Sequence, residues 1–230
     1  MVQLVKRSPG FVGYTDACAT GMGGVWFSGN KRLENLCWRV PFPKDIVDEV
    51  ISDVNPKGRL TNSYLELAAA LVHYDVLCLN TDMRSRLSAI FSDNTPTVAW
   101  CTKMADNSIS PVAGRLLRGF SMFQRQELSA PVLLAHVIGD ENKMADYSSR
   151  SYNTVLITAT NTQFLAVFNS TFPIQDVTWT SASLPTEIIS NVISSLSAVH
   201  SRIANRLPHS KLMTFEMISV GRDALVQVTS

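Results

Sequence analysis

Four acidic residues occupy positions that are informative about chemistry. Asp16 lies inside a run of aromatic and β-branched residues that predicts a strand, where an acid is disfavoured. Glu66 lies in the first turn of a predicted helix that is otherwise apolar, and Asp93 lies where a predicted strand ends and a helix begins. Asp146 lies in a predicted short helix, four residues after Asn142. Because ligands collect near strand ends in open α/β sheets, a mixed sheet could bring these carboxylates together.

A cluster of four carboxylates would need positive charge at neutral pH, because its members repel one another. Two divalent cations supply that charge, and oxygen ligands without paired His or Cys favour Mg²⁺ or Mn²⁺ over Zn²⁺. Two such ions, about 3.5–4 Å apart, are the apparatus for in-line displacement at phosphorus. The pattern therefore predicts a phosphoryl-transfer site with two Mg²⁺ ions, for which Mn²⁺ can substitute.

Each acid, taken alone, also has a structural interpretation. Asp93 could cap the helix that follows it, and Glu66 could interact with the helix macrodipole. Asp146 could pair with Arg150, which follows it by four residues. Asp16 in the middle of a strand is harder to explain in this way. The chemical interpretation depends on all four acids occurring in this order on this pattern of elements.

The hydrophobic pattern predicts a meander of three strands followed by alternating strands and helices. The meander strands are expected at residues 11–20, 25–27 and 36–40, with a glycine-rich turn between the first two. Helices are then expected at 62–79, 95–104, 111–128 and 142–149, and strands at 87–92 and 132–138. This order predicts an α/β fold with a five-stranded mixed sheet flanked by helices.

The composition changes after Arg150. Residues 151–230 hold twelve Ser and ten Thr but only four basic and four acidic residues, and a helical pattern returns at 185–207. We therefore expect a catalytic domain over residues 1–150 and a Ser/Thr-rich, partly helical C-terminal extension or connector over 151–230.

Composition also limits the compartment and the partners. With 46% hydrophobic residues, 17% charged residues and a net charge of +1, the chain can bury a core but is not polybasic as a whole. Four cysteines without a CxxC pair indicate reduced thiols in an intracellular protein. The first fifteen residues lack a signal-peptide core, and no stretch reaches the ~20 apolar residues of a membrane span. We expect a cytoplasmic or nuclear protein that is not secreted and has no membrane partner.

One predicted helix, residues 111–128, has an apolar face and a basic face. Arg115, Arg118 and Arg125 fall together on the side opposite the apolar residues. This side is either a solvated basic face or a set of phosphate contacts that positions a nucleic acid without reading its sequence. Lys143, close to Asp146 in the sequence, is a lesser candidate for such a contact.

The four acids stand in motifs that resemble those of ribonuclease H, over about residues 11–150. The motif around Asp16 is TDACATGMGGV, the motif around Glu66 is NSYLELAAA, and the motif around Asp93 is FSDNTPTVAW. Asp146 stands in HVIGDENKMADYSSR, which resembles the ending of retroelement ribonuclease H, His-x-Pro-Gly-x-x-Asn-x-x-Ala-Asp-x-Leu-Ser-Arg. The following stretch FLAVFNSTFPIQDVTW resembles polyproteins of the tyrosine-recombinase (DIRS-like) group, with a gypsy-like element as the alternative.

This resemblance implies a ribonuclease H-like fold and an endoribonuclease that cuts the RNA strand of RNA–DNA hybrids, leaving 5′-phosphate ends. It implies a part in retroelement reverse transcription, beside a reverse transcriptase domain of the same polyprotein. Asp16 would bridge two metal ions, and Asp146 would help hold the ion that activates water. Glu66 and Asp93 would help hold the ion at the leaving 3′ oxygen. Asn94, in the motif of Asp93, is a further candidate for contact with nucleic acid.

The sequence departs from the family pattern in three places. Ile138 stands where proline is expected, and Ser148 replaces leucine. The loop before the last helix, near residues 139–141, lacks the histidine of many cellular ribonucleases H, and His136 on the preceding strand is interpreted as packed or hydrogen-bonded. Two alternatives therefore stay open: a catalytically weak or inactive module that acts as a nucleic-acid-binding scaffold, and a DNA strand transferase or resolvase.

Overall fold

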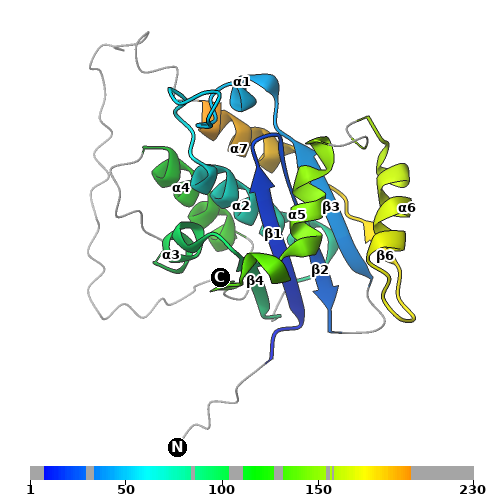
Figure 1. Ribbon diagram of the computed structural model, residues 1–230. Coiled ribbons are helices and arrows are strands. Elements are labelled where there is room, and N and C mark those ends of the chain that lie inside the picture. The colour runs from blue at the N-terminus through cyan, green and yellow to red at the C-terminus, as the bar shows by residue number, and fades with distance from the viewer. Residues whose placement is uncertain are drawn as a thin grey trace, which may run out of the picture. The chain divides into compact units, whose positions relative to one another are not determined.

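A mixed sheet of six strands in the order β5-β4-β1-β2-β3-β6 forms the centre of the computed structural model (Figure 1). The strands are β1 (Phe11–Cys18), β2 (Gly21–Ser28), β3 (Asn35–Pro41), β4 (Ser88–Ser92), β5 (Val132–His136) and β6 (Trp179–Ser181). Strands β1, β2 and β3 form an antiparallel meander. Strand β4 runs parallel to β1, β5 parallel to β4, and β6 parallel to β3. The α/β class and the mixed sheet predicted from the sequence are confirmed.

The structure describes residues 8–29, 34–83, 86–103, 111–126, 132–153, 156 and 158–197, without the side chains of 119–126 and 153. Residues up to His200 belong to one compact unit, and the second unit, Ser201–Ser230, lies outside the described residues. Within the described residues, none of the helices is long and apolar enough to cross a membrane.

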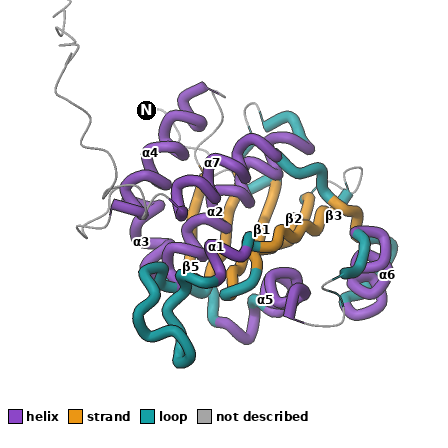
Figure 2. Tube along the Cα trace, turned by 90° about the horizontal axis from the view of Figure 1, so that it is seen from above, coloured by secondary structure: helices purple, strands orange, loops and turns teal. Residues whose placement is uncertain are grey.

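Helices cover both faces of the sheet, as the view from above shows (Figure 2). The α-helices are α1 (Lys44–Val47), α2 (Asn62–Asn80), α3 (Thr95–Lys103), α4 (Pro111–Gln126), α5 (Lys143–Arg150), α6 (Asn161–Thr171) and α7 (Thr186–Ser197). Two 3₁₀ turns, Gly139–Glu141 and Ser151–Asn153, precede and follow α5. Helix α2 packs on β1, β2 and β4 and also contacts α3, α4 and α7, whereas α5 packs on β1, β2 and β3.

Helix α2 is buried along most of its length because the sheet lies on one side and other helices on the other. Every residue from Leu65 to Leu77 is buried, which agrees with a sequence that is apolar all round. Its His73 stacks on Trp26 with ring centroids 4.1 Å apart, and its Nδ1 accepts a hydrogen bond from Trp38 Nε1. A Cβ at Gly13 of β1 would lie 2.2 Å from His73 Nε2, so the glycine makes room for this layer. His73 is therefore a packed residue of the core.

Residues after α5 return to the same sheet, so the prediction of five strands is wrong. Strand β6 pairs with β3 through Asn35 opposite Trp179, and Trp179 is buried. A strand of three residues is too short to show a periodic pattern in the sequence. Without β6, the outer edge of β3 would have unpaired backbone groups, which favours pairing with an additional strand. Helix α7 lies within the predicted helical region 185–207 and packs on α2 and α4. The division of the chain near residue 150 coincides with the end of α5 and stays a prediction.

Candidate active site

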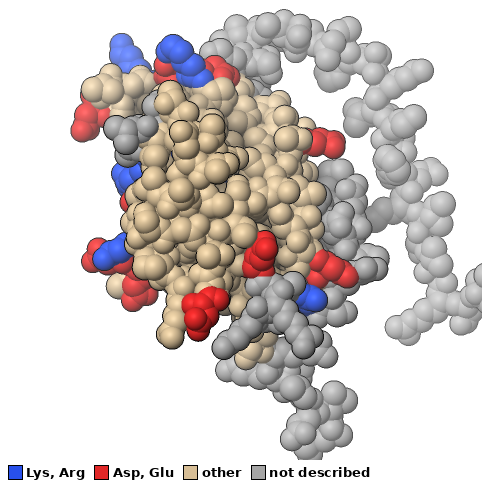
Figure 3. All heavy atoms as spheres, turned by 90° about the vertical axis from the view of Figure 1, so that its right-hand side faces the viewer, with Lys and Arg blue, Asp and Glu red and all other residues tan. Residues whose placement is uncertain are grey.

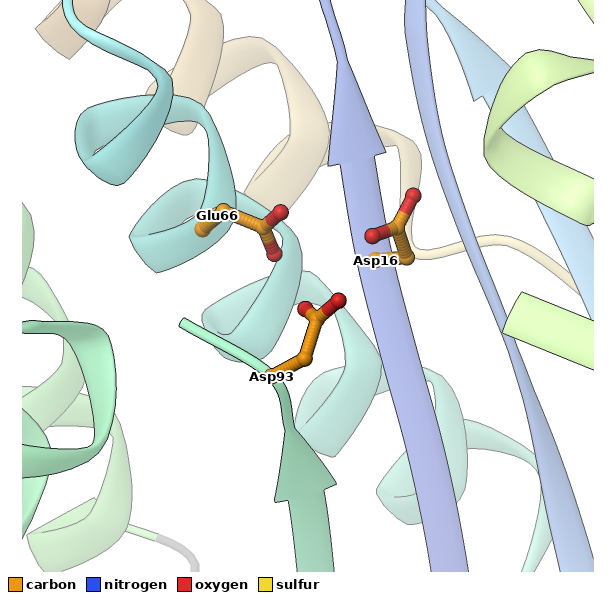
Figure 4. A group of neighbouring side chains, drawn as sticks. All are labelled: Asp16, Glu66 and Asp93. Carbon is orange, nitrogen blue, oxygen red and sulfur yellow. The ribbon is translucent and has the colours of Figure 1, made fainter. Parts of the chain in front are cut away.

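Three of the four predicted acids meet at one edge of the sheet. Asp16 of β1, Glu66 of α2 and Asp93, which follows β4, each offer an oxygen, and these oxygens lie within 4.8 Å of one another. Figure 4 shows the three carboxylates directed toward a common point. Three separate elements thus bring together residues that are far apart in the sequence.

The topology explains this convergence. Strands β1 and β4 are parallel neighbours, with Tyr14 opposite Phe91. Two residues further along each strand, Asp16 and Asp93 therefore reach the same carboxyl-terminal edge, where open α/β sheets bind ligands. Helix α2 begins near this edge, and Glu66 lies in its second turn, so the prediction of a first-turn position is wrong.

Glu66 gives the clearest indication that the cluster fits a cation. Its side chain is 2% exposed, and among the described residues Oε2 has no hydrogen-bond partner. The other oxygen, Oε1, accepts a long hydrogen bond from Asn62 Nδ2 at 3.4 Å, and the backbone of Ala17 also acts on this carboxyl and lowers its pKa. An unpaired buried carboxylate oxygen is costly unless a cation compensates it. The donor set consists of oxygens only, as Mg²⁺ and Mn²⁺ prefer.

The pKa values of two cluster members are raised, as expected for buried carboxylates that lie close together. The pKa of Asp16 is raised to about 6, mainly by burial; the hydrogen bond from Ser149 opposes this rise, and the charges of Asp146 and Asp93 add to it. Burial, followed by the charges of Asp16 and Asp93, also raises the pKa of Glu66 well above its usual value. Both shifts mean that the ionised cluster is unfavourable without a compensating cation.

Asp146 is held differently from the other three acids. Its carboxylate pairs with the Arg150 guanidinium on the same helix, and the two side chains are 41% and 58% exposed. The structural interpretation of Asp146 as an i,i+4 partner of Arg150 is therefore confirmed. Asp146 still lies close enough to Asp16 to affect its pKa after the larger effects of burial and Ser149. Its role as a metal ligand stays a prediction.

Helix α5 is held against the strands next to Asp16 by residues for which no role was predicted. The Ser149 hydroxyl donates a hydrogen bond to the Asp16 carboxylate, and Asn142 Nδ2 donates to the Thr15 carbonyl at 3.1 Å. A Cβ at Gly23 would lie 2.7 Å from the Ser148 Cβ. Glycine at position 23 thus leaves room for the buried Ser148, which stands where the family pattern has leucine. In the sequence, only the positions of Ser149 and Asn142 in the last motif could have indicated these contacts.

The candidates for nucleic-acid contact are placed unequally. Asn94 Oδ1 accepts a hydrogen bond from the Thr97 N–H, so this residue caps α3. The Arg115 guanidinium donates to the Ser195 carbonyl of α7 at 2.9 and 3.3 Å. Three further candidates differ in what the structure describes: Arg118 and Lys143 are exposed, and the side chain of Arg125 lies outside the described residues. Contact of any of these residues with nucleic acid stays a prediction.

His136 stands next to the cluster at the end of β5. Its Nε2 lies 3.2 Å from the Asp93 carbonyl oxygen, which can only accept, so Nε2 carries the proton of this hydrogen bond. The hydrogen-bonded interpretation of His136 is confirmed, but the side chain is exposed rather than packed. Ile138, which stands where proline was expected, is 59% exposed.

Adding Mg²⁺ or Mn²⁺ at pH 7 is expected to raise the melting temperature of the full chain by about 5 °C, because the ion relieves the repulsion in the cluster. The Glu66→Gln variant should show a much smaller rise, since it removes one ligand charge. Asp140→Asn changes an exposed acid outside the cluster and should behave like wild type. Differential scanning calorimetry measures all three. Equal rises in the three proteins would show that the ions bind elsewhere.

Comparison with known proteins finds similarity among solved structures only. No family model matches the chain, and no curated protein matches it. The chain is similar to LC11-RNase H1, isolated from compost by a metagenomic approach, with 14% identity, a TM-score of 0.43 and coverage of 64% of this chain and 100% of that one. For LC11-RNase H1 in complex with an RNA/DNA hybrid the values are 13%, 0.42, 60% and 92%.

A viral structure is also similar. The foamy viral protease-reverse transcriptase in complex with an RNA/DNA hybrid has 15% identity and a TM-score of 0.40, over 67% of this chain and 22% of that one. Because these identities and TM-scores are low, they carry no conclusion about activity. The assignment of a function therefore depends on the residues of the site.

Proposed function

We propose that the chain is an endoribonuclease that hydrolyses the RNA strand of RNA–DNA hybrids with two divalent metal ions. The observation that carries this proposal is the meeting of Asp16, Glu66 and Asp93, with a buried Glu66 oxygen that has no other partner. Each of these acids stands in a motif that resembles ribonuclease H. We further propose that the chain is a module of a DIRS-like or gypsy-like retroelement polyprotein, next to a reverse transcriptase domain, in the cytoplasm or nucleus.

The residues of the site would have two roles, metal binding and the orientation of a metal ligand. Asp16, Glu66 and Asp93, together with Asp146, would hold Mg²⁺, for which Mn²⁺ can substitute. Bound ions of this kind lower the pKa of water and stabilise charge on phosphoryl oxygens. Ser149 orients the Asp16 carboxylate through its hydrogen bond, which leaves fewer rotamers to be fixed when substrate binds.

Exposed cations would position the hybrid, since the acid cluster alone repels phosphate. Arg118 and Lys143 are exposed, whereas Arg115 donates to the Ser195 carbonyl, and we propose Arg118 and Lys143 as phosphate contacts. The middle of the face seen in Figure 3 carries little charge. Residues 158–197, which build α6 and β6, contain no Lys or Arg. That side of the molecule is therefore unsuited to bind a nucleic-acid backbone.

One observation favours a second candidate, a weak or inactive nucleic-acid-binding scaffold of the same fold. The 3₁₀ turn before α5, Gly139–Glu141, contains no histidine. The nearby His136 is engaged with the backbone carbonyl of Asp93 through one ring nitrogen. Substrate binding would then survive without cleavage.

The test is incubation of the full chain with a hybrid whose RNA strand is 5′-labelled, in Mg²⁺ or Mn²⁺. We expect cleavage of the RNA strand to products with 3′-hydroxyl and 5′-phosphate ends, and no cleavage of duplex DNA. An Asp93→Asn protein purified in the same way controls for contaminating nucleases and should be inactive. Binding without cleavage would favour the scaffold, and cleavage of duplex DNA would favour a strand transferase or resolvase.

A further inference from the structure

Arg150 forms an ion pair with Asp146, the fourth acid of the proposed site. It is the last residue of α5, and its Nε contacts Asp146 Oδ1 one turn earlier on the same helix. The carboxylates that converge within 4.8 Å are those of Asp16, Glu66 and Asp93, and Asp146 is outside this group. One carboxylate of the proposed site is thus neutralised by a side chain of the protein itself.

The charges of this pair reach the cluster. Burial is the main cause of the raised pKa of Asp16, but Asp146 raises it further and Arg150 lowers it. Arg150 in turn has its pKa raised first by the hydrogen bond to Asp146 and, more weakly, by the charges of Asp146 and Asp16. Both side chains of the pair therefore lie within electrostatic range of the cluster.

The pair is also easy to separate, whereas the helix that carries it is not. Both side chains are about half exposed, and exposed ion pairs contribute little stability. Helix α5 itself is fixed at both ends, by Asn142 on the Thr15 carbonyl and by Ser151, which donates to the Ser148 carbonyl and accepts from the buried Arg39. A rotamer change of Asp146 is therefore the movement that the structure allows.

We propose that Arg150 is a positioning residue that sets the affinity for the second of two divalent ions by holding Asp146 away from the cluster. The inference rests on the proposed function. A first ion would bind to Asp16, Glu66 and Asp93 without disturbing the pair. A second ion would bind only when Asp146 exchanges the Arg150 guanidinium for the metal.

The experiment is titration of the full chain with Mn²⁺ in the absence of nucleic acid, followed by calorimetry and by the electron paramagnetic resonance signal of free Mn²⁺. Wild type should bind one ion tightly and a second weakly. In Arg150→Gln the second ion should bind about tenfold more tightly, as expected for removal of one charge beside a divalent ion at a half-exposed site. The first affinity should change less than about threefold, since Arg150 is the weakest of the charges that act on the pKa of Asp16.

Two variants separate pairing from general charge. Lys143→Gln removes one exposed positive charge from the same helix and should shift the second affinity much less than Arg150→Gln. Arg150→Lys keeps the charge and should stay close to wild type. A second affinity that is unchanged in Arg150→Gln, or changed equally by Lys143→Gln, would overturn the proposal.

The outcome also distinguishes this inference from the proposed function. If two ions bind and hybrid is cut but Arg150→Gln has no effect, only the role of Arg150 fails. If wild type binds no Mn²⁺, the metal site fails and the role of Arg150 fails with it. Because the Arg150 side chain is 58% exposed, its replacement is expected to keep the fold, and a melting curve of each variant checks this.

Discussion

Asp16→Asn is expected to reduce cleavage of the RNA–DNA hybrid by at least about 1,000-fold, because the variant loses the carboxylate that would bridge both metal ions. Asparagine has nearly the same shape and retains an oxygen that can accept the hydrogen bond from Ser149. The fold should therefore be kept. Single-turnover cleavage at pH 7 in Mg²⁺ measures the loss, and circular dichroism checks the structure.

The same substitution should make the metal-free chain more stable. The pKa of Asp16 is about 6 in the folded protein against an ordinary value of 3.8, mainly because of burial. The folded state therefore binds this proton more tightly, and the stability that it contributes is present below pH 3.8 and is lost as pH rises through 6. Two pKa units correspond to about 3 kcal/mol, so Asp16→Asn should gain roughly that much at pH 7.

The quantity to measure is the difference in free energy of unfolding between Asp16→Asn and wild type, because His73 also titrates. Burial lowers the pKa of His73, so this residue destabilises the fold as pH falls below 6.5 and acts in both proteins alike. The stability difference in urea should grow from pH 4 to pH 6 and then level off. Asp140→Asn, an exposed acid, should change neither rate nor stability. Cleavage by Asp16→Asn at the wild-type rate would contradict the metal assignment.

Three of the site residues could be predicted from the sequence because each of them departs from the pattern of its immediate neighbours. Asp16 interrupts a strand pattern, and Glu66 stands at the start of an apolar helix. Asp93 follows a strand that the structure places parallel to the first. Topology rules then bring their elements to one edge of the sheet. The fold class could be predicted because the hydrophobic pattern changes from that of strands in the meander to that of helices later in the chain.

Other features depend on contacts that no periodic pattern records. The hydrogen bond of Arg115 to Ser195 joins two helices separated by a change of composition. The i,i+4 spacing of Asp146 and Arg150 was visible in the sequence, but the rotamers that join them were not. The pairing of Trp179 with Asn35 of β3 spans most of the chain and involves only three residues of β6.

This late pairing leads to the second large effect: a chain ending at Arg150 is expected not to fold stably. It would lack Phe164, Phe168 and Trp179, which are at most 3% exposed and pack together against Val25 and Cys37 of the sheet. Burial of an aromatic or aliphatic side chain contributes roughly 1.5–3 kcal/mol. Loss of this burial free energy for the three side chains, together with that of the buried side chains on α7, approaches the entire free energy of unfolding of a typical domain.

The loss of hydrogen bonds adds to this effect. Arg39 of β3 is 5% exposed and donates to the Ser151 hydroxyl and to the carbonyls of Leu156 and Ala159. Its guanidinium also lies over the rings of Tyr152 and Phe164, at 4.9 and 4.4 Å. A chain that ends at Arg150 leaves this charge beside the sheet without any of these partners, which is costly unless water reaches it.

Urea unfolding of that chain should be compared with unfolding of a chain ending at Ser197, which keeps every described contact. We expect a cooperative transition for the longer chain and loss of more than about 5 kcal/mol, or no transition at all, for the shorter one. Equal midpoints would mean that residues 151–197 are a connector, as the composition suggested, and that the structural boundary lies at residue 150. The expected result instead makes α6, β6 and α7 part of the unit that holds Asp16 in place.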